Sequence, residues 1–203
     1  MTVWEPPIRE YDFLCNEVFN AIESIEGLGF EDFDADYLAM LTEGWGMHAK
    51  EVWLPINELG DKKGLKFEDG SIYMPQEFKD AYRKGIEEGW LSTACKPEHG
   101  GMGVPTFFQS VTWAEFGTSA CMALSVLPAL SIGVYEVLTS NGRQDLVDYF
   151  APNLASGFWA GTMCLTEPHA GTDLGIITTR AEPEDDGTYR ISGTKIFITY
   201  GEH

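Results

Sequence analysis

The pattern of apolar residues changes once along the chain, and this change limits the folds that it can adopt. Up to about residue 150, apolar residues recur at helical spacing. From Phe158 onward the pattern is typical of short strands. Helix-rich sequence followed by strand-rich sequence predicts an α+β protein or two separate domains, rather than a doubly wound parallel sheet.

Two helices are predicted in the first part. The first has one apolar face and ends at Gly27 and Gly29; that face holds Tyr11, Leu14, Val18, Ile22 and Ile25. The second runs from Asp36 towards Val52, and its expected core residues are Met40, Trp45, Met47, Val52 and Trp53. Residues 57–73 are rich in Gly, Lys and Asp and predict an irregular connector.

Further helices are predicted after Pro75, which can begin a helix without losing a hydrogen bond. The next helix carries Phe78, Tyr82 and Ile86 on one face and ends at Gly89. After the Gly- and Pro-rich residues 97–105, Thr106 and Gln109 have capping-box spacing. A later helix is expected from Met122 to Asn141 and Gly142, with a kink at Pro128.

Four strands are predicted in the second part, over residues 158–164, 176–182, 189–192 and 195–200. Asp186 and Gly187 form a hairpin signal, and the acidic run from Glu182 to Asp186 predicts a solvated hairpin tip.

The charge balance limits the partners of this chain. It has 203 residues with 13 Lys plus Arg against 32 Asp plus Glu, a formal charge of −19, which disfavours nucleic acid and anionic membranes. A phosphorylated ligand would need local donors such as backbone N–H groups and hydroxyls. The amino-terminus lacks a signal peptide, and the apolar stretches fall short of about 20 residues, so we expect a soluble cytoplasmic protein.

The cysteines, Cys15, Cys95, Cys121 and Cys164, have no paired spacing and lie in apolar runs, so reduced and buried thiols are expected. The four histidines, His48, His99, His169 and His203, share no metal-ligand spacing, so no metal site is predicted.

The segment from Met163 to Asp173 combines hydroxyls, a proline and a glycine after an apolar run. It can be an ordinary β-turn, with Thr166 and Asp173 bonded to nearby backbone. Alternatively, Thr166 and the backbone beside it present donors to a flat cofactor, while Gly171 and Thr172 approach a phosphate. Composition does not decide between the two.

Three ordered motifs resemble those of one enzyme family. Residues 164–173, Cys-Leu-Thr-Glu-Pro-His-Ala-Gly-Thr-Asp, resemble the flavin-binding signature C-x-T-E-P-x-x-G-S-D of acyl-CoA dehydrogenases. Residues 97–103 resemble the family element P-E-x-x-G-G-x-G with one position fewer between Glu and Gly, and residues 191–199 resemble I-x-G-x-K-x-W-I-T. The resemblance covers residues 75–203, and the helical segment before it is similar to that of longer members such as the 3-methylmercaptopropionyl-CoA dehydrogenase type.

The resemblance implies a domain order. Residues 1–74 would be a helical extension and connector, residues 75–157 the all-helical amino-terminal domain, and residues 158–203 the first strands of a β-barrel-like middle domain. The carboxy-terminal helical bundle would be absent, and with it the glutamate that removes the substrate α-proton, so no catalytic residue is assigned within this chain.

The resemblance also implies an FAD site. Its residues would be Met163, Cys164, Leu165, Thr166, Gly171, Thr172, Phe197, Ile198 and Thr199. Thr166 and the backbone of Leu165 would lie beside the flavin ring, and Thr172 would lie between the flavin pyrophosphate and the acyl-CoA substrate. Three positions depart from the family pattern: Phe197 replaces Trp and loses an indole donor, Thr172 replaces Ser, and Met163 stands where many members have an aromatic ring.

The implied function is dehydrogenation of an acyl-CoA to an enoyl-CoA as part of a longer, homo-oligomeric enzyme that passes electrons to an electron-transfer flavoprotein; the chain alone would be inactive. Two alternatives stay open: an acyl-CoA oxidase that uses oxygen, and a short non-catalytic helical binding or oligomerisation protein.

Two further interpretations concern side chains. Phe107, Phe108 and Trp113 could line an acyl tunnel or belong to the core, and Glu98 with His99, or Glu167 with His169, could be acid–base pairs or shape their loops.

Overall fold

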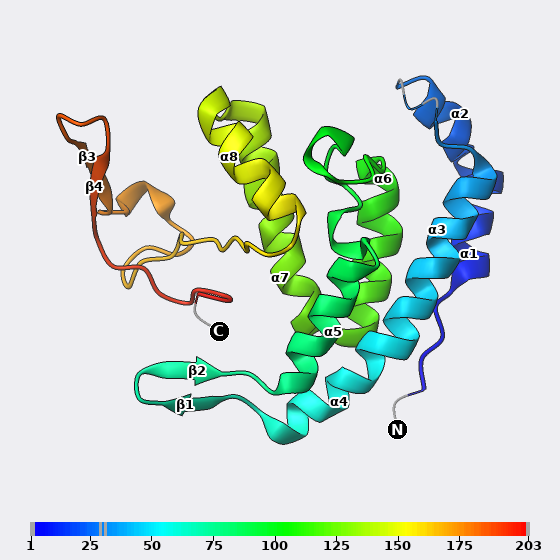
Figure 1. Cartoon of the computed structure of the whole chain (residues 1–203), viewed down its shortest axis with the longest axis horizontal. Helices are drawn as coiled ribbons and strands as arrows, with labels where there is room; N and C mark the ends of the chain where they lie inside the picture. The colour runs from blue at the N-terminus through cyan, green and yellow to red at the C-terminus, as the bar shows by residue number, and fades with distance from the viewer. Residues whose placement is uncertain (1–2, 29, 31, 202–203) are drawn as a thin grey trace. The chain divides into compact units, whose positions relative to one another are not determined.

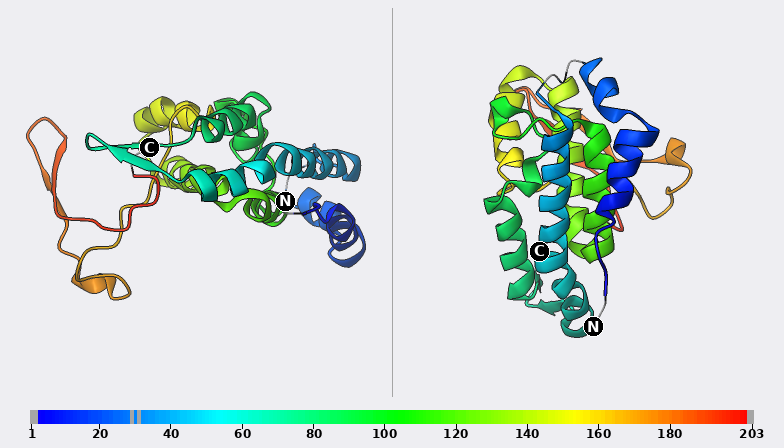
Figure 2. Two further views of the ribbon diagram at one scale, coloured as in Figure 1. Left: turned by 90° about the horizontal axis from the view of Figure 1, so that it is seen from below. Right: turned by 90° about the vertical axis from the view of Figure 1, so that its right-hand side faces the viewer.

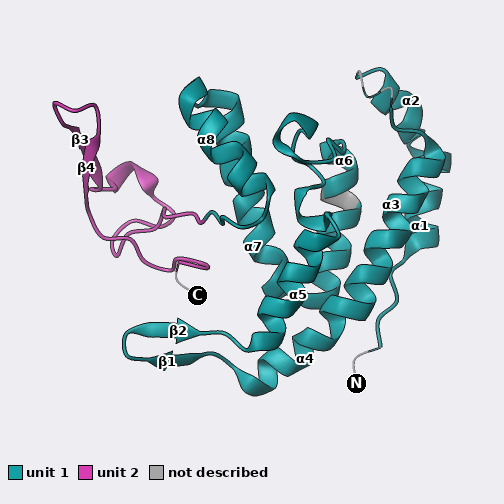
Figure 3. Cartoon of the chain, viewed as in Figure 1, with its two compact units in different colours: residues 1–161, 203 teal, residues 162–202 magenta. Residues whose placement is uncertain are grey.

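The chain is largely helical up to Ala155 and largely irregular after it, as Figure 1 shows for the computed structural model. The structure describes residues 3–28, 30 and 32–201, with the backbone alone at 110 and 111. Two compact units meet in the sequence at Gly161 and Thr162 (Figure 3). The predicted order of the two parts is confirmed at the level of a mostly helical chain with small strand pairs.

The predicted first helix is interrupted, so a single helix from Tyr11 to Ile25 was wrong. Helix α1 (Ile8–Phe13) continues into a π-helical turn, η1 (Leu14–Val18), and α2 (Ala21–Glu26) follows. Asn20 separates them with a φ of 45°, a left-handed conformation that ends a right-handed helix. The predicted end at Gly29 lies outside the described residues.

The predicted second helix is confirmed and extends further. Helix α3 (Ala35–His48) continues through a π-helical turn, η2 (Ala49–Trp53), into α4 (Leu54–Lys63). The Asp34 side chain caps α3, since its Oδ1 accepts a hydrogen bond of 2.8 Å from the Tyr37 N–H.

The buried face of α3 differs in part from the predicted one. Trp45 is buried as expected, but Met40 and Met47 are exposed. The buried stripe passes through Leu38 and Leu41, which leaves both methionines beside it.

Residues 57–73 do not form an irregular connector, so that prediction was wrong. After α4, strand β1 (Lys66–Glu68) pairs antiparallel with β2 (Ser71–Tyr73). Asp69 and Gly70 join them with φ values of 51° and 80°, which suits the two-residue turn favoured by hairpins. Strands of three residues are too short to show an alternating pattern in the sequence.

Several later helix boundaries agree with those predicted from the sequence. Helix α5 (Gln76–Glu87) begins after Pro75, and two short 3₁₀ turns, η3 (Trp90–Ser92) and η4 (Pro97–His99), follow it. Helix α6 (Thr106–Phe108), the π-helical η5 (Gln109–Trp113) and α7 (Ala114–Asn141) form the next run, and α8 (Gln144–Ala155) packs on α7. The long helices of this unit run side by side (Figure 2).

Two details of this run correct the sequence analysis. Thr106 is the first helical residue rather than the cap, and Pro105 occupies the cap position without a side-chain bond. The run breaks at Cys121, whose φ and ψ of −156° and 94° are non-helical, next to the predicted boundary at Met122. Pro128, the predicted kink, lies inside helical backbone.

Helix α7 is also longer and more apolar than expected. Residues 116–135 carry no charged side chain, and by length and composition the helix could cross a membrane. Within the unit it packs against its neighbours, with Phe116, Leu124 and Tyr135 buried. Core helices of water-soluble proteins have the same length and composition, so these two properties do not distinguish a core helix from a membrane-spanning one.

An aromatic cluster forms the centre of the helical unit. Trp45 stacks on Trp113 at 5.2 Å between ring centroids and on His48 at 5.5 Å, and Trp53 meets it edge-on. The Trp45 Nε1 donates to the Trp113 carbonyl at 3.1 Å. Each large ring therefore contributes both buried area and a fixed geometry to the core.

The cysteines are free thiols, as expected, but only part of the burial prediction holds. Cys95 and Cys121 are buried and Cys15 is half-buried, whereas Cys164 is exposed. Burial raises the pKa of the Cys95 thiol to about 12 and also raises that of Cys121.

The second unit contains one strand pair and a 3₁₀ turn among the residues that the structure describes. Strand β3 (Arg180–Pro183) pairs antiparallel with β4 (Tyr189–Ser192), which confirms the predicted hairpin at Asp186 and Gly187. The strands predicted over 158–164 and 195–200 are wrong, and residues 174–176 form η6 (Leu174–Ile176) rather than the start of a strand. Every residue of β3 and β4 is exposed, so within the described part of the chain neither face of this hairpin is covered.

Candidate functional site

A tight turn organises the segment that carries the first motif. The Glu167 N–H donates to the Ala170 carbonyl at 2.8 Å, and the Ala170 N–H donates back to the Glu167 carbonyl at 3.1 Å. Pro168 fixes its own φ within this turn, as proline favours. The β-turn expected from the sequence is therefore present.

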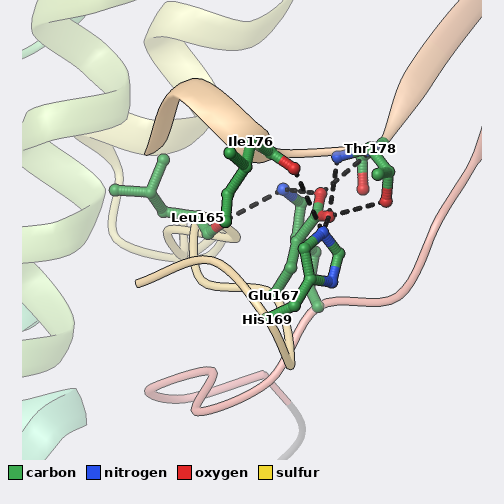
Figure 4. A network of polar contacts seen from close by, with 7 residues as sticks. Leu165, Glu167, His169, Ile176 and Thr178 are labelled. Carbon is green, nitrogen blue, oxygen red and sulfur yellow. Dashed lines mark hydrogen bonds and ion pairs between the residues drawn. The ribbon is translucent and has the colours of Figure 1, made fainter. Parts of the chain in front are cut away.

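The Glu167 carboxylate is the centre of this segment, and it is buried (Figure 4). Its Oε2 accepts hydrogen bonds from the Thr178 N–H at 2.8 Å and from the Thr178 hydroxyl at 2.9 Å. Its Oε1 accepts bonds from the Thr179 N–H and from the Lys195 Nζ, each at 2.9 Å. A buried carboxylate with this many donors is stably ionised.

The same contacts set the titration of Glu167. The donors of Thr179 and Thr178 and the Lys195 ammonium together hold the pKa of this carboxyl well below its usual range. A carboxylate that stays ionised is a poor proton donor or acceptor near neutral pH. The structure thus favours a loop-shaping role for Glu167 over an acid–base role.

The network also brings the two candidate motif segments together. The Ile196 N–H donates to the Thr166 carbonyl at 2.9 Å, and the Lys195 Nζ donates to the Leu165 carbonyl at 2.9 Å. The Thr162 hydroxyl bonds to the Thr199 carbonyl. Residues 162–167 and 195–199 therefore lie side by side, although some thirty residues separate them in the sequence.

Most of the candidate cofactor residues are exposed around this junction. Met163, Cys164, Leu165, Gly171, Thr172, Phe197 and Thr199 are exposed, and Thr166 and Ile198 are half-buried. Gly171 lies near Thr166, since a Cβ built on it would be 3.9 Å from the Thr166 Cγ2. The structure therefore joins the Leu165–Thr166 segment to residues 195–199, and gives no contact that joins Thr172 to them.

The exposed groups suit a flavin in two respects. Within the described part of the chain, the amides of Leu165 and Thr166 and the hydroxyls of Thr166 and Thr172 have no hydrogen-bond partner. Phe197 is 88% exposed with a φ of 57°, so its ring is accessible to solvent rather than packed in a core. Free donors beside an exposed ring are what a flat, polar-edged heterocycle requires.

Gly193 shows why one motif position is glycine. Its φ is 152°, and a Cβ placed there would lie 2.1 Å from the Thr179 Oγ1. Any side chain would push residues 193–195 away from the threonines that hold Glu167. Gly193 thus allows Lys195 to reach the carboxylate.

The Gly- and Pro-rich segment 97–105 belongs to the helical unit and serves packing. A Cβ on Gly101 would lie 2.0 Å from the Cys95 carbonyl oxygen, and the Gly103 N–H donates to that carbonyl at 2.8 Å. The buried Tyr135 hydroxyl accepts a bond of 2.9 Å from the Lys96 N–H and contacts the His99 Nδ1 at 2.7 Å.

The remaining candidates have structural surroundings. The exposed Glu98 lies 3.9 Å from the Nε2 of His99, whose side chain is only 10% exposed. The His169 Nε2 contacts the Ile176 carbonyl at 3.1 Å and lies 3.4 Å from the Glu167 Oε2. Phe108 and Trp113 are buried in the core, whereas Phe107 is exposed. Among the described residues no group of His, Cys, Asp and Glu could hold a metal ion, and His203 lies outside them.

Sequence reasoning missed the largely buried Glu167–Lys195 ion pair, which joins the two segments of the site. The signal was present, because one residue lies in each of the two motifs that the sequence singled out and their charges are opposite. The pairing was not predicted because 28 residues separate Glu167 from Lys195 in the sequence.

Comparisons with known proteins agree on one family. The family described as acyl-CoA dehydrogenase, N-terminal domain, matches residues 65–158. The chain is 35% identical to the 3-methylmercaptopropionyl-CoA dehydrogenase of Ruegeria pomeroyi over 98% of its own length. It spans only 34% of that relative, and between 26% and 33% of three further curated relatives.

Solved structures agree on the fold. An acyl-CoA dehydrogenase from Bacillus anthracis, complexed with FAD, superposes with a TM-score of 0.65 over 83% of this chain and 27% of that one, at 23% identity. The butyryl-CoA dehydrogenase of Megasphaera elsdenii gives 0.65 over 81% of this chain and 41% of that one, also at 23% identity. A structure described under the electron transferring flavoprotein of Acidaminococcus fermentans gives 0.68 over 81% of this chain and 40% of that one, at 23% identity.

Proposed function

Because this chain belongs to the amino-terminal region of the acyl-CoA dehydrogenase family, we propose that it provides one side of an FAD site for the dehydrogenation of an acyl-CoA thioester. The observation that carries the proposal is the junction of Thr166 with Ile196. It sets two flavin-motif segments side by side and leaves their donors and the Phe197 ring accessible.

The proposed binding residues divide into two groups. The amides of Leu165 and Thr166 and the Thr166 hydroxyl would bond to the polar edge of the flavin ring, while Phe197 packs on its face. Gly171 and Thr172 would lie near the pyrophosphate. FAD, when bound, supplies the hydride acceptor for the substrate β-carbon.

Two parts of the reaction are proposed to lie in sequence that the relatives have and this chain lacks. A thioester α-proton is too weakly acidic for a carboxylate in water, so the reaction needs a desolvated base and a polarised carbonyl in a closed site. We do not assign Glu167 as that base, because its carboxylate is buried, its pKa is lowered and both oxygens already accept hydrogen bonds from Thr178, Thr179 and Lys195. We propose that the catalytic base is a residue of the longer protein. We also propose that the longer protein passes its electrons to a separate electron-transfer flavoprotein.

Titration of the chain with FAD tests the cofactor proposal. Flavin fluorescence should change on mixing, and Thr166→Val should weaken binding about fivefold, because it removes one hydroxyl bond and keeps the side-chain shape. Thr194→Val is the matched control, an exposed threonine of the same unit with no hydrogen-bond partner in the described part of the chain. Equal affinities for the two variants would contradict the assignment of Thr166.

A turnover assay tests the division of the reaction. The chain with FAD, a range of acyl-CoA thioesters and an artificial electron acceptor should show no sustained turnover. Sustained turnover by this chain alone would mean that a base within residues 1–203 performs the proton abstraction.

A further inference from the structure

The contacts of Glu167 and Lys195 differ from those of the other charged pairs in the second unit. Their side chains are 1% and 19% exposed, and the Lys195 Nζ lies 2.9 Å from the Glu167 Oε1. The pairs Arg180–Glu182 and Arg190–Glu184 are largely exposed, and such surface pairs contribute little. A buried pair of this kind is costly to break, because removal of one partner leaves an uncompensated charge.

The pair also spans the junction. Lys195 bonds at the same time to the Leu165 carbonyl and to the Glu167 carboxylate, so one ammonium group fixes both the backbone and the side chain of the opposite segment. Glu167 directly follows Thr166, and Lys195 precedes Phe197 by two residues. The two charged groups are largely buried, while Leu165 and Phe197 are exposed and Thr166 is half-buried.

We infer that Glu167 and Lys195 are positioning residues of the flavin site, which fix the spacing between the Leu165–Thr166 donors and the Phe197–Thr199 segment. The inference rests on the proposed function. Neither residue contacts the cofactor; together they hold the two segments in the register set by the Ile196-to-Thr166 hydrogen bond.

Hydrogen exchange of the whole chain tests this inference without a ligand. In Glu167→Gln and in Lys195→Met, the Ile196 amide should exchange about tenfold faster than in the wild type, because its partner segment is released. The amides of the β3–β4 ladder lie in the same unit and should stay as protected as before. Lys195→Arg, which keeps the charge, should restore most of the protection, and Glu182→Gln is the matched control.

FAD titration of the same variants supplies the second measurement. The affinity should fall about tenfold in Glu167→Gln and Lys195→Met, and should recover in Lys195→Arg. Tryptophan emission should stay unchanged throughout, since all six tryptophans lie before Thr162 and report on the helical unit alone.

Three results would overturn the inference: unchanged Ile196 exchange, simultaneous loss of the β3–β4 protection, or faster Ile196 exchange with unaltered FAD affinity. The second would show that the pair holds the unit together as a whole rather than setting the register. Failure of the proposed function looks different. The wild-type chain would then bind no FAD although Ile196 is protected, and the exchange rates alone would decide whether the pair fixes the register.

Discussion

Single residues show how burial and partners decide between chemical and structural roles. Glu167 and His48 are both buried ionisable groups, but Glu167 is surrounded by donors and His48 by aromatic rings. The His48 Nδ1 lies 2.6 Å from the Glu88 Oε2, and its Nε2 has no partner among the described residues. Burial lowers the pKa of His48, whereas the nearby Glu88 carboxylate raises it. The effect of burial is the larger, so the pKa of His48 lies below its usual value.

This environment predicts a pH-dependent stability. A histidine whose pKa is lowered in the folded state takes up its proton more readily when unfolded, so its contribution is complete above the unfolded pKa near 6.5. The free energy of unfolding should therefore fall as the pH decreases below about 6.5. Chemical denaturation followed by tryptophan emission at several pH values measures it.

His48→Phe should flatten this dependence, since it keeps a ring in the aromatic cluster and removes the titrating group. His169→Gln is the control, because His169 is exposed and lies outside the helical unit. An unchanged slope in His48→Phe would show that other groups, such as Glu88, govern the acid sensitivity.

The boundaries of the helices in the helical unit depend on single residues at the helix ends more than on the spacing of apolar residues. Asp34 begins α3 through a side-chain bond, Asn20 interrupts the first helical run, and Pro75 precedes α5. Each of these residues acts through local backbone geometry, and each is visible in the sequence.

The Asp34 cap offers a test at this scale. Asp34→Ala should lower the free energy of unfolding of the helical unit by about 1 kcal/mol, because the Tyr37 N–H loses its partner. Thermal unfolding followed by circular dichroism measures the change. Asp36→Ala, two residues further on in the first turn of α3 and without a cap bond, is the comparison, and equal losses in both variants would argue against capping.

The sequence predicted the elements with local signals and failed where the signal is non-local. The ends of α5 and α7 and the β3–β4 hairpin follow from Pro75, Asn141 and Asp186, which act on adjacent backbone. The strands expected over 158–164 and 195–200 do not form, because a strand requires a hydrogen-bonded partner that no periodicity can supply. In the site, motif resemblance identified the two segments, but only coordinates showed that Lys195 joins them to Glu167.

At the scale of the whole molecule, the two units differ in how much apolar surface they cover. The helical unit buries a core of large rings that includes Trp45, Trp53 and Phe116, whereas Ala170 is the only buried apolar residue among the described residues of the second unit. The apolar side chains of the second unit that are more than 60% exposed include Met163, Tyr189, Ile191 and Phe197. The two strands of its hairpin also have open edges, which other chains can pair with.

This surface predicts concentration-dependent self-association of the 203-residue chain. Sedimentation velocity should show larger species as the concentration rises, and Ile191→Lys should reduce them by placing a charge on β4. Val137→Lys is the matched control, an exposed apolar residue on α7 of the helical unit. A monomer at all concentrations, with cooperative unfolding, would contradict this expectation.

The uneven burial of the cysteines makes the chain convenient for site-selective chemistry. Thiol reagents act on accessible thiolates, and the raised pKa values of Cys95 and Cys121 together with their burial protect them. Cys164 is exposed and lies two residues before Thr166. A maleimide fluorophore or spin label would therefore attach first beside the proposed flavin segment, so the unaltered sequence already contains a reporter position at the place where binding has to be observed.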